Sequence, residues 1–108
     1  MGEEIPAWPF GSEGSIIFGL GFALSERITI KGGVVQQSNF SDYHVPRMNE
    51  IPDIHVELIT TDNDPTGVGE VTTPLVAPAI GNAIATLTGI RLRRAPMTPD
   101  RVLAQMKA

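Results

Sequence analysis

Residues 13–33 have the sequence EGSIIFGLGFALSERITIKGG, which contains two elements of different kinds. Residues 13–26 are apolar on nearly every side, and this pattern predicts a helix buried against other elements. Because the glycines within it lower the helix propensity, we expect another backbone to pack closely against its glycine side. From Arg27 the side chains alternate up to a Gly-Gly pair, and a second alternating run follows at 34–38. Two such runs around two glycines predict a β-hairpin.

The rest of the chain predicts two strands and two helices. Residues 53–61 alternate between apolar and polar side chains, as a strand does. Thr73 and Pro74 are typical of a helix start, with the threonine as N-cap, and Gly89 lies where a left-handed C-cap belongs. The basic run IRLRR at 90–94 predicts a short C-terminal strand, and a last helix follows from Thr98-Pro99 to Met106. The expected fold class is α+β, in the order helix, hairpin, further strand, helix, short strand and helix.

The length of 108 residues and the mass of 11.6 kDa allow one domain with a single modest core. Residues 1–12 contain prolines and show little periodicity, so we expect an irregular lead-in there. The α+β domain then spans 13–108, with Ser12 able to cap its first helix.

The composition excludes several classes of protein. The net charge of −4 argues against a nucleic-acid partner. The chain has no cysteine, which excludes disulfides, iron–sulfur ligation by this chain and cysteine-type zinc sites. No basic signal-peptide region is present, and the apolar run at 16–24 is shorter than the roughly 20 residues that a bilayer requires. We therefore expect no membrane span and a cytoplasmic or periplasmic location.

The segment GVGE at 67–70 is the candidate site that the residues themselves indicate. Its glycines allow the backbone to approach a bulky ligand and to take φ > 0. Glu70 lies three residues before the expected helix N-cap, where the helix dipole favours an ionised carboxylate and burial opposes it. A carboxylate held in this way can act as a general base. A structural turn explains the same residues without any chemistry.

No metal-ligand pattern is present in the sequence. His44 and His55 are the only histidines, and no HExxH or similar spacing surrounds them. His55 and Glu57 share one face of the expected strand, which two surface residues explain as well as a zinc site does. We therefore predict no metal ligand within this chain.

Four blocks follow one another in an order typical of a known family. They are EGSIIFGLGFALSERITIKGG at 13–33, VVQQSNFSDYHVPRMNEIPDIHVELI at 34–59, GVGE at 67–70 and TPLVAPAIGNAIATLTGIRLR at 73–93. Together they resemble the C-terminal end of the molybdenum-binding large subunit of the xanthine dehydrogenase and aldehyde oxidase family, above all its isoquinoline 1-oxidoreductase beta-subunit branch. The chain departs from the family at residues 1–12 and at Val71, where the family usually has proline.

The resemblance implies the tail of a larger molybdopterin-binding domain and an oxidoreductase function. In the family, the glutamate of the GVGE block is the general base beside the molybdenum, and this glutamate corresponds to Glu70. Gly67, Val68 and Gly69 would then form the turn next to the cofactor. The complete enzyme would hydroxylate an N-heterocycle or an aldehyde with oxygen from water, using molybdopterin in its cytosine dinucleotide form.

The same resemblance implies two polypeptide partners, the remainder of the large subunit and an iron–sulfur subunit. The 108-residue chain alone would be inactive and would bind no cofactor. The alternative function is that of a non-catalytic α+β module. Its apolar, glycine-containing helix at 14–24 would then form a homodimer, because exposed apolar patches are typical of protein–protein interfaces.

Overall fold

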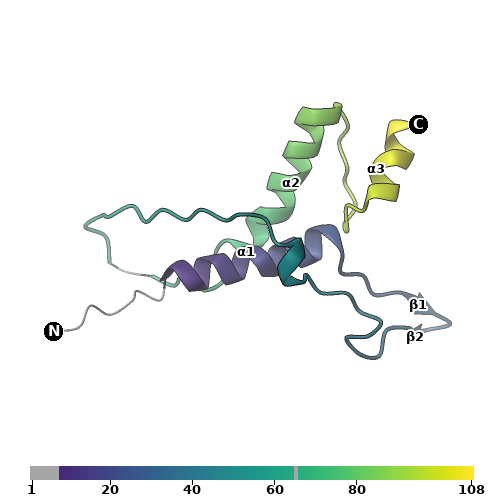
Figure 1. Ribbon diagram of the computed structural model, residues 1–108, viewed down its shortest axis with the longest axis horizontal. Helices are drawn as coiled ribbons and strands as arrows, with labels where there is room; N and C mark the ends of the chain where they lie inside the picture. Colours follow the sequence, from purple (N-terminus) through teal and green to yellow (C-terminus); the bar gives the residue numbers. More distant parts are fainter. Residues whose placement is uncertain (1–7, 65) are drawn as a thin grey trace.

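The computed structural model describes residues 8–64 and 66–108. Along the chain, the elements are α1 (Trp8–Leu24), β1 (Ile30–Lys31), β2 (Val34–Val35), the 3-10 helix η1 (Met48–Glu50), α2 (Thr73–Thr88) and α3 (Pro99–Met106). Figure 1 shows α1 lying along the long axis of the molecule, with α2 rising from it, α3 beside α2, and the hairpin projecting beyond the end of α1. Helices and a sheet are both present, as the α+β prediction requires.

Helix α1 begins earlier than the sequence indicated. Its first residue is Trp8, so the expectation of an irregular chain up to residue 12 is wrong for residues 8–12. Pro9 falls in the first turn, where the missing proline N–H has no helical partner to lose. Residues 1–7 of the expected lead-in lie outside the described residues.

The hairpin is confirmed, although its strands are shorter than expected. Ile30 pairs with Val35 and Lys31 with Val34 in an antiparallel sheet. Both glycines of the turn have positive φ, 59° and 78°, which is the conformation that a two-residue turn of this kind requires. Next to the paired residues, the side chain of Gln37 links the two arms of the hairpin, because its Oε1 accepts the Thr29 N–H at 2.7 Å.

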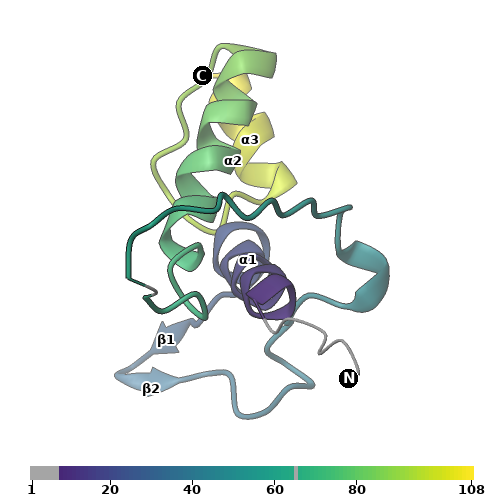
Figure 2. The same ribbon diagram turned by 90° about the vertical axis from the view of Figure 1, so that its left-hand side faces the viewer.

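The two further strands are not formed. Residues 53–61 pair with no strand in the described part of the chain, and neither do residues 90–94. An alternating pattern produces a strand only where a neighbouring backbone supplies the ladder hydrogen bonds. Residues 53–61 instead run back past α1 (Figures 1 and 2), and Leu58 and Ile59 leave 57% and 82% of their surface exposed.

The Gly89 end of α2 and the Thr98 start of α3 are confirmed, whereas Thr73 as the N-cap of α2 is wrong. Helix α2 has proline in its first turn and ends at Gly89, whose φ is 77° and whose N–H donates to the carbonyl of Ala85 at 2.8 Å. Its N-cap is Thr72, one residue before the predicted position. Helix α3 follows Thr98 as its N-cap, as expected.

Helices α1 and α2 approach each other closely at Gly19. A Cβ added there would lie 2.7 Å from the carbonyl oxygen of Thr73 and 2.8 Å from Cγ2 of Val76. The expectation that a second backbone lies against the glycine side of this helix is therefore confirmed at Gly19. The segment before α3 is also attached to α1, because the Met97 N–H donates to the carbonyl of Ala23 at 2.6 Å.

The core is smaller than the length led us to expect. Within residues 11–64 and 66–108, only three hydrophobic side chains are buried, those of Ala23, Val76 and Met97. The accessible surface is 8621 Å², against about 5,800 Å² for a compact monomer of this mass. The radius of gyration is 17.4 Å, against about 13 Å for a compact chain of this length. Much apolar surface therefore remains uncovered by this chain.

The longest helix of the structure is α1, with 17 residues. Within the described residues, none of the helices has both the length and the apolar character that crossing a membrane demands.

Candidate active site at the start of α2

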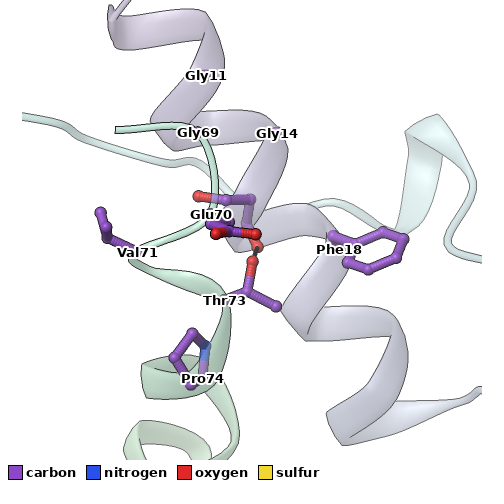
Figure 3. Close-up of a pocket in the computed structure, with 9 residues that line it drawn as sticks. Gly11, Gly14, Phe18, Gly69, Glu70, Val71, Thr73 and Pro74 are labelled. Carbon is purple, nitrogen blue, oxygen red and sulfur yellow. Dashed lines mark hydrogen bonds between the residues drawn. The ribbon is translucent and has the colours of Figure 1, made fainter. Parts of the chain in front are cut away.

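Glu70 lies in an open pocket of ≈ 730 Å³ between α1 and the start of α2 (Figure 3). The turn before α2 contributes Gly69, Glu70 and Val71, and the first turn of α2 contributes Thr73 and Pro74. The facing side of α1 contributes Gly11, Gly14, Ser15 and Phe18. Among the described residues that line the pocket, none is basic, and Glu70 is the only charged one.

The glycines beside Glu70 face open space. A Cβ added at Gly67 or Gly69 would meet no atom of the described chain within 4 Å. Neither residue has positive φ, so this turn does not use the left-handed conformation that glycine allows. Packing within the chain therefore explains neither glycine, and the space beside this backbone is free for another group. Gly69 lines the pocket, whereas Gly67 and Val68 lie outside it.

The turn passes over the N-terminal half of α1. A Cβ at Gly11 would lie 3.9 Å from Cα of Gly69 and 3.9 Å from the carbonyl oxygen of Val68, which is ordinary van der Waals contact. The structure thus brings Gly69 and Glu70 together with the glycine-bearing side of α1, a neighbour that the sequence motif did not indicate.

The carboxylate of Glu70 has no partner within the described residues. Neither ion pair of this part of the chain involves Glu70, and no hydrogen bond to its side-chain oxygens is formed there. Its backbone carbonyl accepts the Thr73 N–H at 3.2 Å, which closes the turn into α2. Glu70 therefore presents an exposed, unpaired carboxylate to the pocket.

Hydroxyl groups attach this turn to α1. The Thr73 hydroxyl donates to the carbonyl of Ser15 at 3.0 Å (Figure 3), and the Thr72 hydroxyl lies 3.5 Å from the carbonyl of Ser12. The Ser15 hydroxyl donates to the carbonyl of Ser12 at 3.0 Å and also contacts the Thr72 hydroxyl. These contacts were not predicted from the sequence, although polar Ser12 and Ser15 lie three residues apart on one face of an apolar helix.

The two histidines form separate contacts with neighbouring carboxylates. Nε2 of His44 lies 2.8 Å from Oε1 of Glu50, and Nε2 of His55 lies 3.3 Å from Oε1 of Glu57, as their shared face predicted. The Arg47 N–H, and to a lesser extent His44, lower the pKa of Glu50. In the described ranges, no three His, Asp or Glu side chains converge in a way that could hold a metal ion.

Residues 12–52 match the model of the molybdopterin cofactor-binding domain family. The chain is 50% identical over 95 residues to isoquinoline 1-oxidoreductase subunit beta of Brevundimonas diminuta, a match that covers 88% of this chain and 12% of that protein. It is 34% identical over 97 residues to the xanthine dehydrogenase molybdenum-binding subunit of Escherichia coli O157:H7, covering 82% of this chain and 13% of the relative.

The fold has a close counterpart among solved structures. Quinoline 2-oxidoreductase from Pseudomonas putida 86 superimposes with a TM-score of 0.80 at 20% identity, over 92% of this chain and 14% of that chain. These relatives define a class of molybdenum-binding oxidoreductase subunits. The chain belongs to this family, the molybdenum-binding subunits of xanthine dehydrogenases, aldehyde oxidoreductases and isoquinoline oxidoreductases. It spans about an eighth of the length of the curated relatives it matches.

Proposed function

We propose that the chain is the C-terminal segment that supplies the general base of a molybdenum hydroxylase large subunit, and that this base is Glu70. The observation that supports the proposal is the position of Glu70, which has an unpaired carboxylate in an open pocket beside glycines with free space around them. A structural turn would not need an exposed carboxylate directed at a pocket, whereas a proton acceptor does.

The residues of the pocket fit one end of a molybdopterin group. Gly14 and Gly69 leave the backbone accessible, since a Cβ at each would meet nothing in the described chain within 4 Å. Because the pocket has no Lys or Arg, its residues suit the metal-bearing end of the group and not its phosphates. Other polypeptide must therefore hold most of the cofactor. We infer that the cofactor, in its cytosine dinucleotide form, binds the complete enzyme and not the isolated chain.

When bound, molybdopterin supplies the two-electron redox chemistry. This chain contributes the proton acceptor: the Glu70 carboxylate takes a proton from the water-derived hydroxyl group that attacks the substrate. Gly67, Val68 and Gly69 carry this carboxylate on a backbone without bulky side chains at the two glycines. The substrate class is an N-heterocycle or an aldehyde, because both contain the electron-poor carbon that such an attack requires.

The uncovered apolar surface supports the proposed partners. Leu58 and Ile59 on the unpaired segment and Ile30 and Val34 on the hairpin are all more than half exposed. We infer that the remaining polypeptide of the large subunit covers them, since burial of apolar area is the main driving force of association. An iron–sulfur subunit would then take the electrons, because this chain has no cysteine to bind a cluster.

The test is Glu70→Gln in the complete large subunit, produced together with its iron–sulfur subunit. Dye reduction with an N-heterocycle should fall by about 10²–10⁴-fold, because one positioned proton acceptor is lost. Molybdenum and pterin contents should stay at the wild-type level. Glu57→Gln, the same change at an exposed carboxylate outside the pocket, is the matched control. Full turnover by Glu70→Gln would remove the base assignment.

A second candidate function is a homodimer formed through α1. Phe18 and Phe22 are 58% and 44% exposed on this helix and contact each other edge to face, with ring centroids 4.7 Å apart. Exposed aromatic pairs are typical of interfaces. Light scattering after size exclusion should then give a dimer at micromolar concentration, and Phe18→Ser should convert it to a monomer. A wild-type monomer under these conditions would contradict this alternative.

A further inference from the structure

The two residues that start α2 are attached to α1 through their side chains. The Thr73 hydroxyl donates to the carbonyl of Ser15 at 3.0 Å, across 58 residues of sequence. The Thr72 hydroxyl contacts the Ser15 hydroxyl, which itself donates to the carbonyl of Ser12 at 3.0 Å. We refer to Ser15, Thr72 and Thr73 as the hydroxyl cluster. It joins the turn that carries Glu70 to the helix on the other side of the pocket.

The hydroxyl cluster lies on the best-packed side of α1. Ser15 is only 5% exposed, and Ser12 is 9% exposed. Gly19 lies four residues after Ser15 on the same face and makes the close approach to the carbonyl of Thr73 and to Val76. The hydrogen bonds from Thr72 and Thr73 to this side of α1 are partly buried, and such bonds are more costly to lose than exposed ones. The start of α2 is therefore fixed to α1 at this position.

The loop before this position has few contacts of its own. Residues 66–71 are all exposed, and Gly67 and Gly69 have free space around them. The Thr73 N–H donates to the carbonyl of Glu70 at 3.2 Å, so the turn is closed directly onto the first residue of α2. The location of the Glu70 carboxylate thus depends on where α2 begins, and the hydroxyl cluster sets that point relative to α1.

We propose that Thr73 and Ser15 are positioning residues for Glu70. The geometry that points to this role is the three-residue spacing between Glu70 and Thr73, together with the hydroxyl contacts from the start of α2 to α1. The inference rests on the proposed function of Glu70. Neither residue need touch the substrate or the cofactor for this role, and each acts on the reaction only through the place of the Glu70 carboxylate.

The test compares Thr73→Val, which removes the hydroxyl at nearly constant volume, with Thr73→Ser, which keeps it. Both are made in the complete large subunit with its iron–sulfur subunit. Thr73→Val should lower kcat by about tenfold or more with little change in KM, because small displacements of a catalytic group are costly. It should also speed amide hydrogen exchange over residues 67–73 by about fivefold to tenfold, since one hydrogen bond is lost. Thr73→Ser should restore both.

Thr86→Val is the matched control. The Thr86 hydroxyl donates to the carbonyl of Asn82 at 3.0 Å within α2 and is exposed, so its loss leaves the turn intact. Wild-type kcat and wild-type exchange at 67–73 are expected for this variant. If Thr73→Val does not accumulate as folded protein, Ser15→Ala, which removes the partner of Thr72 and leaves the Ser15 carbonyl in place, replaces it with the same expected direction in both measurements.

Failure of this inference can be distinguished from failure of the proposed function. Wild-type kcat and wild-type exchange in Thr73→Val, in an enzyme that Glu70→Gln inactivates, would overturn the positioning role and keep the base assignment. A Glu70→Gln enzyme with full turnover would overturn the base assignment, and with it the positioning role that depends on it. A loss of kcat in Thr73→Val that Thr73→Ser does not restore would also overturn the role of the hydroxyl.

Discussion

The junction between α1 and α2 and the surface formed by the hairpin with residues 53–61 have opposite characters. At the junction, Ser12, Ser15 and Val76 are buried, and the hydroxyl groups of Thr72 and Thr73 contact α1. On the outer surface, Leu58 and Ile59 are more than half exposed, and the backbone of residues 53–61 forms no ladder with any described strand. The described chain buries side chains at the junction, and it leaves the apolar side chains of the outer surface exposed.

The difference bears on the proposed remainder of the large subunit. Burial of apolar area is the largest favourable contribution to folding, so the exposed apolar side chains are the ones that this proposed polypeptide would cover. The curated relatives are about eight times as long as this chain. The Glu70 turn is attached to the buried junction and not to the exposed surface.

The largest effect that separates the two regions is expected for Leu58→Lys. In the 108-residue chain the effect on stability should be under about 0.5 kcal/mol, as for most surface substitutions. In the complete subunit it should cost about 1.5–3 kcal/mol in lost apolar burial, plus the cost of placing a charge there. The yield of molybdenum-containing subunit measures the difference. Glu57→Lys, at a neighbouring exposed position that already carries a charge, is the control, and equal yields of the two variants would contradict the idea of a covered face.

The next effect compares two glycines of α1. Gly19→Ala should destabilise the helices by about 1–3 kcal/mol, because the added Cβ meets the backbone carbonyl of Thr73 and cannot be accommodated without a shift. Gly14→Ala should stabilise α1 by up to about 1 kcal/mol, because its Cβ meets nothing and alanine favours a helix. Thermal unfolding followed by helical circular dichroism measures both, and the same sign for the two variants would refute the packing difference.

The smallest effect concerns a pH-dependent contact in the loop that follows the hairpin. The N–H groups of Asn39 and Ser38 hold the pKa of Asp42 below its usual value. The folded loop therefore gains stability above the pKa of an unfolded aspartate, about 3.9, and loses it as the pH falls through the lower folded value. The amide NMR signals of Ser38 and Asn39 should shift in acid. Asp42→Asn should abolish this titration, and its persistence would assign the effect to another group.

The sequence predicted the elements whose signals are local. The turn glycines of the hairpin, the proline start and Gly89 end of α2, and the Thr98 start of α3 each depend on a few adjacent residues. The strands at 53–61 and 90–94 were predicted wrongly, because alternation describes which side chains could share a face and not whether a neighbouring strand exists. The early start of α1 at Trp8 was not predicted, because prolines are typical both of irregular chain and of the first turn of a helix.

In the candidate site, too, the sequence predicted the local motif and did not predict its distant neighbours. The identity of Glu70 as the acid to consider came from the GVGE block and from the family resemblance, and its role as a base stays a prediction. Its neighbours on α1, Gly11, Gly14 and Ser15, were not predicted, because they lie more than 50 residues away in the sequence. Gly67 and Gly69 do not adopt the positive φ that glycine allows, and the free space around them distinguishes these glycines.

By itself, the sequence determined the Gly89 end of α2, the Thr98 start of α3, the hairpin and the family of this chain, because caps, turns and motifs act over a few residues or are preserved as blocks. Only the tertiary structure decided that Thr72 and Thr73 meet Ser15 across 57 and 58 residues, and that 53–61 remains without a partner strand. Contacts at such separations depend on how whole elements pack, and packing follows from the complete set of surfaces and not from any one segment.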